Sequence, residues 1–252
     1  RNDGARFDYD SISTFSSVAS AAMQDYYNQL GMQTSFNAYS YYGHTPLTAA
    51  MFSVKYEFTD NTPSLPTNMT EIGSQTYSTG NNAASTVHLY EYNNTLPLGF
   101  MVNMSTEANW NKETGNPFTT QNSFVKTAID SDANIFHQLQ TTDTVGTFTA
   151  KYQLEEDDNY KPSGDAYFYC VTSSETLTVN ITNGSITDDN STTKTFSSTN
   201  QNYICHVGNV SAGSTITVTA SDGQALTTCY AYAFDNDAWE TAYKLLNKNP
   251  YT

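Results

Sequence analysis

The sequence is short of positive charge. Only 10 of its 252 residues are lysine or arginine, against 25 aspartates and glutamates, which gives a formal net charge of −15 at pH 7. Such a surface repels phosphate groups, so the composition argues against nucleic acid as a partner and against a face pressed onto anionic lipid. Charged residues of both signs make up only 14% of the chain. The polar surface is therefore mostly uncharged, as is common in secreted or surface-exposed proteins.

The sequence also lacks any apolar run long enough to span a membrane, and it has no signal peptide at its beginning. Its first residue is Arg1 rather than Met. We therefore expect the chain to be a fragment or a processed form of a longer protein. On this expectation, the lack of a spanning segment describes only the part in hand.

Cysteine is scarce. The three cysteines, Cys170, Cys205 and Cys229, all lie in the last third of the chain, and their odd number gives no disulfide framework. None has the spacing of a zinc site, because Cys205 and His206 are too close together to form one alone. We expect small buried residues in strands. A single disulfide between two of them remains the alternative.

Motifs for metal, cofactor or nucleophilic chemistry are lacking as well. Residues 130–134 have the Asp-x-Asp-x-Asn pattern that opens a calcium loop, but Ile135 and Thr141 stand where that loop needs Gly and Glu. The acidic run at 155–158 reads as a solvated loop, with a structural ion as the alternative. The four histidines have no metal-site spacing, and the chain has no GxSxG motif and no phosphate-binding glycine loop. The sequence predicts no catalytic residue, no metal and no cofactor.

Hydrophobic periodicity divides the chain near residue 140. The first part, 1–140, is expected to mix helices and strands in one domain. Its expected helices cover 17–30, 45–52 and 116–129, and its expected strands cover 54–58, 88–92 and 96–102. Asn116 and Pro117 predict the start of the third helix, as N-cap and first helical residue. Asn93-Asn94 predicts a turn that pairs the last two strands, while 59–84 reads as a loop or a weak excursion and 131–140 as a connector.

The second part, 141–252, consists of short alternating runs separated by turn residues. The runs cover 145–154, 165–172, 175–181, 192–196, 202–207, 214–220 and 226–234. This spacing without intervening helices predicts an antiparallel β-sandwich of the jelly-roll or galactose-binding type. A closing helix over 237–247 follows. The expected fold class is α+β.

Several stretches, taken in order, resemble the YfhO family of large bacterial membrane proteins. They are ISTFSS at 12–17, YYNQLGM at 26–32, YSYYGHTPLTAAMFSVKYEF at 39–58, LPLGFMV at 96–102, NPFTTQNSFVKTAI at 116–129 and AYAFDNDAWETAYKLLNK at 231–248. The resemblance implies a protein with many transmembrane helices. It also implies a glycosyltransferase that uses a polyprenyl-phosphate sugar at the outer face of the membrane, with lipoteichoic acid as one acceptor.

The resemblance further implies that this chain is an extracytoplasmic region whose transmembrane domain is missing. The key acidic residue of such transferases lies in an outer loop that this sequence does not contain, so no catalytic residue is transferred to it. The chain itself is then expected to bind or position a cell-envelope glycopolymer. A glycan-binding module without a transferase role and a scaffold that holds membrane helices in register are the alternatives.

A polar aromatic loop and the helix at 116–129 supply the candidate contact residues. They are Tyr41, Tyr42, His44, Asn116, Gln121 and Asn122. Aromatic faces stack on sugar rings, and side-chain amides bond to sugar hydroxyls. Packing by Tyr42 and capping by Asn116 are the alternative roles of these side chains.

Overall fold

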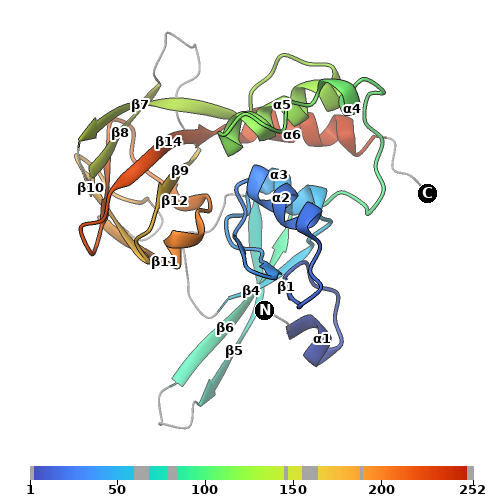
Figure 1. Cartoon of the computed structure of the whole chain (residues 1–252), viewed down its shortest axis with the longest axis horizontal. Coiled ribbons are helices and arrows are strands. Elements are labelled where there is room, and N and C mark those ends of the chain that lie inside the picture. The colour runs from blue at the N-terminus through green and yellow to red at the C-terminus, as the bar shows by residue number, and fades with distance from the viewer. Residues whose placement is uncertain are drawn as a thin grey trace.

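The computed structural model describes residues 3–59, 68–78, 84–144, 147–154, 164–187 and 190–248. A large curled antiparallel sheet occupies one side of the molecule, and helices with two small sheets occupy the other (Figure 1). The expected α+β class, with a β-rich second part and a closing helix, is confirmed.

The elements follow one another as mixed helices and strands and then mainly strands. The helices are α1 (Asp3–Phe7), α2 (Ala21–Gln29), α3 (Pro46–Met51), α4 (Thr106–Asn109), α5 (Pro117–Ile129), the 3-10 turn η1 (Thr199–Gln201) and α6 (Asn236–Leu246). The strands of the small sheets are β1 (Thr14–Phe15), β2 (Thr34–Ser35), β3 (Ala38–Tyr39), β4 (Tyr56–Thr59), β5 (Met69–Ser78) and β6 (Ala84–Tyr92). The strands of the large sheet are β7 (Phe136–Thr144), β8 (Thr147–Leu154), β9 (Asp165–Thr172), β10 (Thr176–Thr182), β11 (Thr193–Ser197), β12 (Cys205–Asn209), β13 (Thr215–Ala220) and β14 (Leu226–Phe234).

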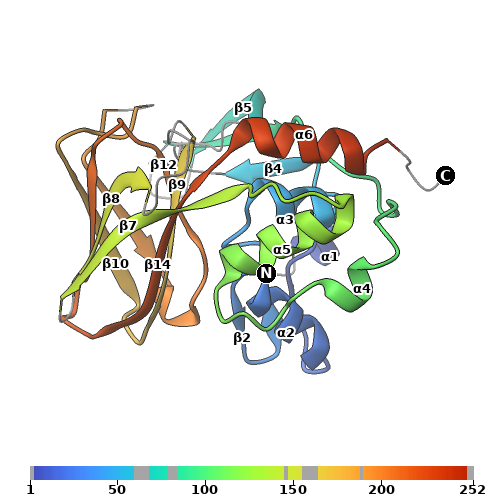
Figure 2. The same ribbon diagram turned by 90° about the horizontal axis from the view of Figure 1, so that it is seen from above.

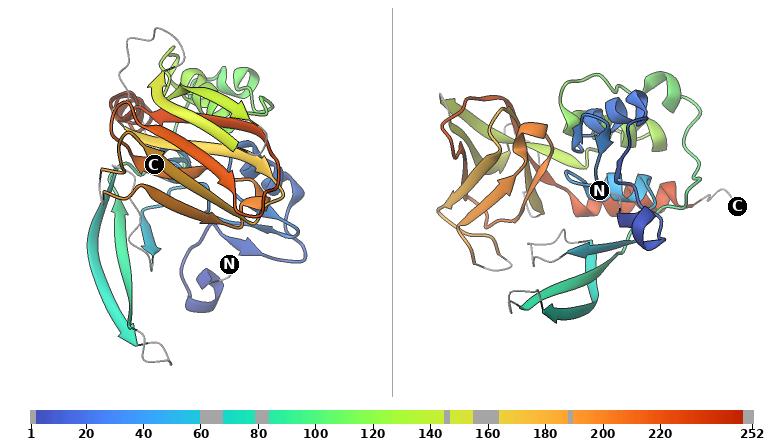
Figure 3. Two further views of the ribbon diagram at one scale, coloured as in Figure 1. Left: turned by 90° about the vertical axis from the view of Figure 1, so that its left-hand side faces the viewer. Right: turned by 60° about the horizontal axis from the view of Figure 1, so that its bottom comes forward.

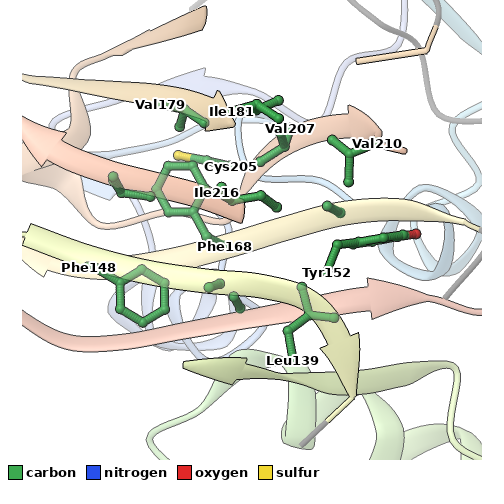
Figure 4. Packing of buried hydrophobic residues seen from close by; sticks show 14 of the residues in the cluster. Leu139, Phe148, Tyr152, Phe168, Val179, Ile181, Cys205, Val207, Val210 and Ile216 are labelled. Carbon is green, nitrogen blue, oxygen red and sulfur yellow. The ribbon is translucent and has the colours of Figure 1, made fainter. Parts of the chain in front are cut away.

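The large sheet is nearly closed into a barrel. Its strands follow the order β11-β10-β13-β8-β7-β14-β9-β12, and every neighbouring pair is antiparallel. Its two outer strands approach each other closely enough for a side chain to join them. The Nζ of Lys194 on β11 donates to the carbonyl oxygens of His206 at 2.8 Å and Val207 at 3.2 Å on β12. Apolar side chains such as Phe148, Phe168 and Ile216 fill the interior (Figure 4).

The central strands of this sheet are buried on both faces. Along β9, Ala166, Phe168 and Cys170 belong to the core inside the sheet, while Tyr167 and Tyr169 belong to a second core outside it. Strand β14 alternates in the same way. The second core is covered by α5 and α6, which lie against the outer face of the sheet (Figure 2). The division of the chain near residue 140 stays a prediction.

The three cysteines lie in strands of the large sheet, as the sequence analysis expects. Cys170 and Cys205 are buried in the interior of the sheet, and Cys229 is partly buried beside them. Cys205 and Cys229 are thiols that form no disulfide.

Three sequence expectations about the first part are wrong. Residues 96–102 form no strand, so the expected hairpin with 88–92 does not exist. Strand β6 instead pairs with β4 and with β5, which lies inside the expected loop at 59–84. The β5–β6 pair projects from the rest of the molecule (Figure 3). Likewise, the expected connector at 131–140 contains the start of β7.

The physical reasons for the wrong strand at 96–102 and for the missed strand β5 are different. In the run at 96–102, Leu96 is buried and Phe100 packs on Phe124, but Leu98 and Met101 face solvent, so the apolar run does not mark a buried strand. Strand β5 is exposed along nearly its whole length, and its backbone hydrogen bonds to β6 hold it in place. Such a strand leaves no hydrophobic pattern for sequence analysis to detect.

The first part contacts the barrel through a close approach of backbone at Gly31. The carbonyl oxygen of Gly31 accepts a hydrogen bond from the backbone N–H of Ile204 at 2.8 Å. Gly31 has a φ of +80°, and a Cβ there would lie 2.6 Å from Cδ1 of Ile204 and 2.8 Å from Cβ of Pro117. Only glycine allows both the left-handed backbone and this contact.

Replacing Gly31 with alanine tests this contact. We expect G31A to lower the free energy of unfolding by about 2–4 kcal/mol, the sum of a left-handed backbone penalty and overpacking. The control is G213A, because Gly213 has a similar φ of +81° with nothing within 4 Å of the added Cβ. It should cost only about 1 kcal/mol. Urea unfolding of the two variants would contradict the close contact if their losses were equal.

Candidate functional site

The loop that carries Tyr41 and His44 is held by a polar network. The two rings stack at 4.0 Å with an interplanar angle of 3°. The hydroxyl of Tyr41 donates to that of Tyr92 at 2.9 Å, which in turn donates to Oε2 of Glu57 at 2.8 Å. His44 Nε2 lies 3.4 Å from the same carboxylate oxygen. This network ties the loop to β4 and β6.

Burial keeps the phenols of this network protonated. It raises the pKa of Tyr41 and of Tyr92 well above 10, and the nearby Glu57 carboxylate raises both further. Neutral hydroxyls can donate to one another and then to the carboxylate, which is the pattern observed. Tyr41 and His44 therefore use their polar atoms inside the protein.

A second histidine–carboxylate pair lies on the barrel. His206 Nε2 is 3.5 Å from Oδ2 of Asp165, and the ring of His206 contacts that of Tyr167 at 4.8 Å. Burial lowers the pKa of His206 from its ordinary value of 6.5. Asp165 acts in the opposite direction, and the charges of Lys194 and His44 lower the pKa further. The neutral imidazole is thus the form that the fold favours.

Tyr42 differs from its neighbour. Its side chain is 68% exposed and has an aromatic contact with Tyr203, at 6.2 Å between ring centroids. Of the aromatic residues expected to contact a ligand, Tyr42 is the one with a ring open to solvent. Its role in binding stays a prediction.

Gln121 and Asn122 both use their amides to join elements of the fold. Gln121 Nε2 donates to the carbonyl oxygen of Leu30 at 2.8 Å, and its Oε1 accepts from Thr45 at 2.6 Å. Asn122 Nδ2 donates to the carbonyl oxygen of Phe136, and its Oδ1 accepts from the N–H groups of Ile135 and Phe136. Asn122 thereby fastens α5 to the start of β7.

Asn116 lies at the edge of an open cleft. It caps α5 as expected, since its Oδ1 accepts from the N–H of Phe118, and its Nδ2 donates to the hydroxyl of Tyr232. The cleft of about 310 Å³ lies between α2 and the segment that leads into α5. Its lining residues are Asp25, Asn28, Gln29, Lys112, Glu113, Gly115, Asn116, Pro117, Thr120 and Tyr169.

The cleft carries the polar groups that sugars require. Asp25 and Glu113 are exposed carboxylates that accept hydrogen bonds, Lys112 donates, and the amides of Asn28 and Gln29 do both. Tyr169 borders the cleft from the second core, with most of its side chain buried. This chemistry suits a ligand with many hydroxyl groups. Within the described residues, no group of three or more His, Cys, Asp or Glu side chains is placed to hold a metal ion.

Most of these cleft residues were missed by sequence analysis. Asp25, Asn28 and Gln29 lie on the polar face of α2, where the helical spacing offers the one signal that could have marked them. A polar helix face usually faces water, so the pattern alone does not distinguish a ligand surface from a solvated one. Of the six predicted contact residues, the structure places Asn116 in this cleft and the other five elsewhere.

Comparison with known proteins gives a family for this fold. A protein-family model described as "Bacterial membrane protein YfhO" matches residues 1–252, the whole chain. The chain belongs to the YfhO family. No curated protein and no solved structure matches this YfhO chain significantly. In the parts of the YfhO chain that the structure describes, no helix is both long and apolar enough to cross a membrane.

Removal of the Asn122 amide tests its structural role. We expect N122A to lower the free energy of unfolding by about 2–4 kcal/mol, because two N–H groups and one carbonyl lose their buried partner. K126A, one turn along α5, is the control and should change stability by less than about 0.5 kcal/mol. Denaturant unfolding measures both. A loss below about 1 kcal/mol for N122A would contradict the role.

The lowered pKa of His206 predicts a loss of stability in acid. Below pH 6.5 the unfolded chain takes up a proton at His206 that the folded chain resists, so the free energy of unfolding falls as pH falls. We expect the melting temperature to drop between pH 7 and pH 5, with a shallower drop in H206Q, whose amide does not titrate. Parallel pH profiles for the two proteins would show that His206 is not responsible.

Proposed function

We propose that this chain is the extracytoplasmic domain of a YfhO membrane glycosyltransferase. In this proposal it sits at the outer face of the cell membrane and binds the acceptor, a cell-envelope glycopolymer such as lipoteichoic acid. The sugar would come from a polyprenyl-phosphate donor, and its transfer would take place on the missing transmembrane part. The single observation that carries the binding role is the polar cleft between α2 and α5.

The charges of the cleft favour one part of such an acceptor. The cleft is lined by two carboxylates, Asp25 and Glu113, and by a single ammonium group, that of Lys112. This balance disfavours a phosphate and suits neutral hydroxyl groups. Tyr169 also lines the cleft, but its side chain is only 8% exposed and belongs mainly to the second core. The hydroxyl-bearing units of the polymer, rather than its phosphates, are therefore what the cleft would bind.

A scaffold role is the second candidate, and specific contacts favour it. Tyr41, His44, Gln121 and Asn122 use their polar groups on internal partners. These contacts make a rigid support for the loop and for α5. A glycan-binding module without a transferase role would share the cleft and would differ in having no effect on transfer.

A binding experiment on the cleft separates these functions. We expect the chain to bind deacylated lipoteichoic-acid fragments or simple sugars by calorimetry. D25A/E113A should weaken this binding by about tenfold or more through loss of two charged acceptors. The control E175A/E240A removes two exposed carboxylates elsewhere and should leave binding unchanged.

The outcomes assign the function as follows. If no fragment or sugar binds the native chain, the cleft is not a glycan site and the scaffold role is favoured. If the chain binds, transfer by the full-length protein carrying D25A/E113A is measured next. Lost transfer supports acceptor binding for catalysis, whereas unchanged transfer supports the separate glycan-binding module.

A further inference from the structure

An uncharged segment runs along the outside of the molecule between β6 and α4. Between Glu91 and Glu107 the sequence holds fifteen residues, none of them Asp, Glu, Lys, Arg or His. This is unusual on a chain whose formal net charge is −15. The segment passes the end of α6 that lies toward the C-terminus (Figure 2), and Tyr243 of α6 donates its hydroxyl to the carbonyl oxygen of Thr95 at 3.2 Å.

Further contacts fix this segment to the body of the protein. Leu96 is buried in the second core. The ring of Phe100 meets that of Phe124 edge-on at 6.4 Å. The backbone N–H of Asn103 donates to the carbonyl oxygen of Ala128 at 2.9 Å, at the end of α5. The segment is therefore held at spaced points on the protein surface.

The residues between and beyond these anchors are apolar and face solvent. Leu98 is 94% exposed, Met101 59%, Val102 39% and Met104 99%. We call these four residues the apolar ridge. Four large apolar side chains within seven positions of the sequence are exposed between anchored neighbours, and water solvates such apolar surface poorly. Such a surface indicates a partner that covers it.

We propose that the apolar ridge enters the interfacial layer of a lipid bilayer. The chain belongs to a family of membrane proteins, so a bilayer is the apolar phase available to it. Leucine and methionine are flexible side chains that fit disordered acyl chains, and the ridge itself carries no charge that would have to leave water. The proposal does not depend on glycan binding by the cleft.

The charge of the rest of the chain makes the proposal specific. The surrounding protein is acidic and repels anionic headgroups, so the proposed attraction to the bilayer comes from the apolar side chains of the ridge alone. Binding should therefore be stronger to uncharged than to anionic bilayers at low salt. Added salt should restore binding to anionic bilayers by screening the repulsion. A contact carried by basic residues would show the opposite dependence.

Flotation with vesicles tests the proposal. The chain is mixed with vesicles of phosphatidylcholine alone and with vesicles that also contain phosphatidylglycerol. We expect the native chain to float with phosphatidylcholine vesicles. The partition coefficient of L98Q/M101Q/M104Q should be lower by a factor of about ten or more. The control V18Q/F36Q changes two side chains that are 88% and 87% exposed elsewhere, and it should bind as the native chain does.

Each other result would overturn the proposal. These results are a native chain that floats with neither vesicle, a triple variant that floats as well as the native chain, and a control that loses binding equally. Salt that weakens binding to the anionic vesicles would also contradict it. If the native chain fails to float but self-associates on a sizing column, and the triple variant does not, the ridge contacts a second copy of the chain instead. Circular dichroism and melting curves confirm that all variants fold.

Discussion

The two-sided burial of β9 and β14 is the constraint on which the rest of the structure depends. Their side chains alternate between the interior of the curled sheet and the outer core beneath α5 and α6. Neither core is complete without these strands. The close backbone contact at Gly31 adds the first part of the chain to the same body, so the cleft beside α5 has walls from elements that are far apart in sequence. The position of the cleft thus follows from the packing of hydrophobic side chains elsewhere.

Several buried polar groups have partners inside the protein. Each of the four histidines lies within salt-bridge distance of a carboxylate, in the pairs His44–Glu57, His88–Glu71, His137–Asp235 and His206–Asp165. The buried phenols of Tyr41 and Tyr92 are likewise paired with each other and with Glu57. An imidazole or hydroxyl buried without such a partner would cost free energy. Residues that looked like ligand contacts in the sequence are in several cases parts of these internal pairs.

The sequence predicted the strands of the second part well and the first part less well, for physical reasons. The bounds of β9 and β14 agree with the sequence analysis to the residue, because alternating apolar runs end there at turn residues. The start of α5 at Asn116-Pro117 agrees because a cap is a local interaction. Strand β5 was missed because its pairing leaves no apolar pattern. The cleft was missed because Asp25 and Glu113 come to line the same cleft only through the packing of α2 near α5, which no local pattern encodes.

The base of the β5–β6 hairpin adjoins the polar network that contains Tyr92. Met69 pairs with Tyr92 at its base, and at about 3.4 Å per residue the ten residues of β5 extend roughly 30 Å from there. Tyr92 is also the residue whose hydroxyl joins Tyr41 to Glu57. Because Tyr92 belongs both to the base of the hairpin and to this network, a single side chain joins the hairpin to the loop of Tyr41 and His44.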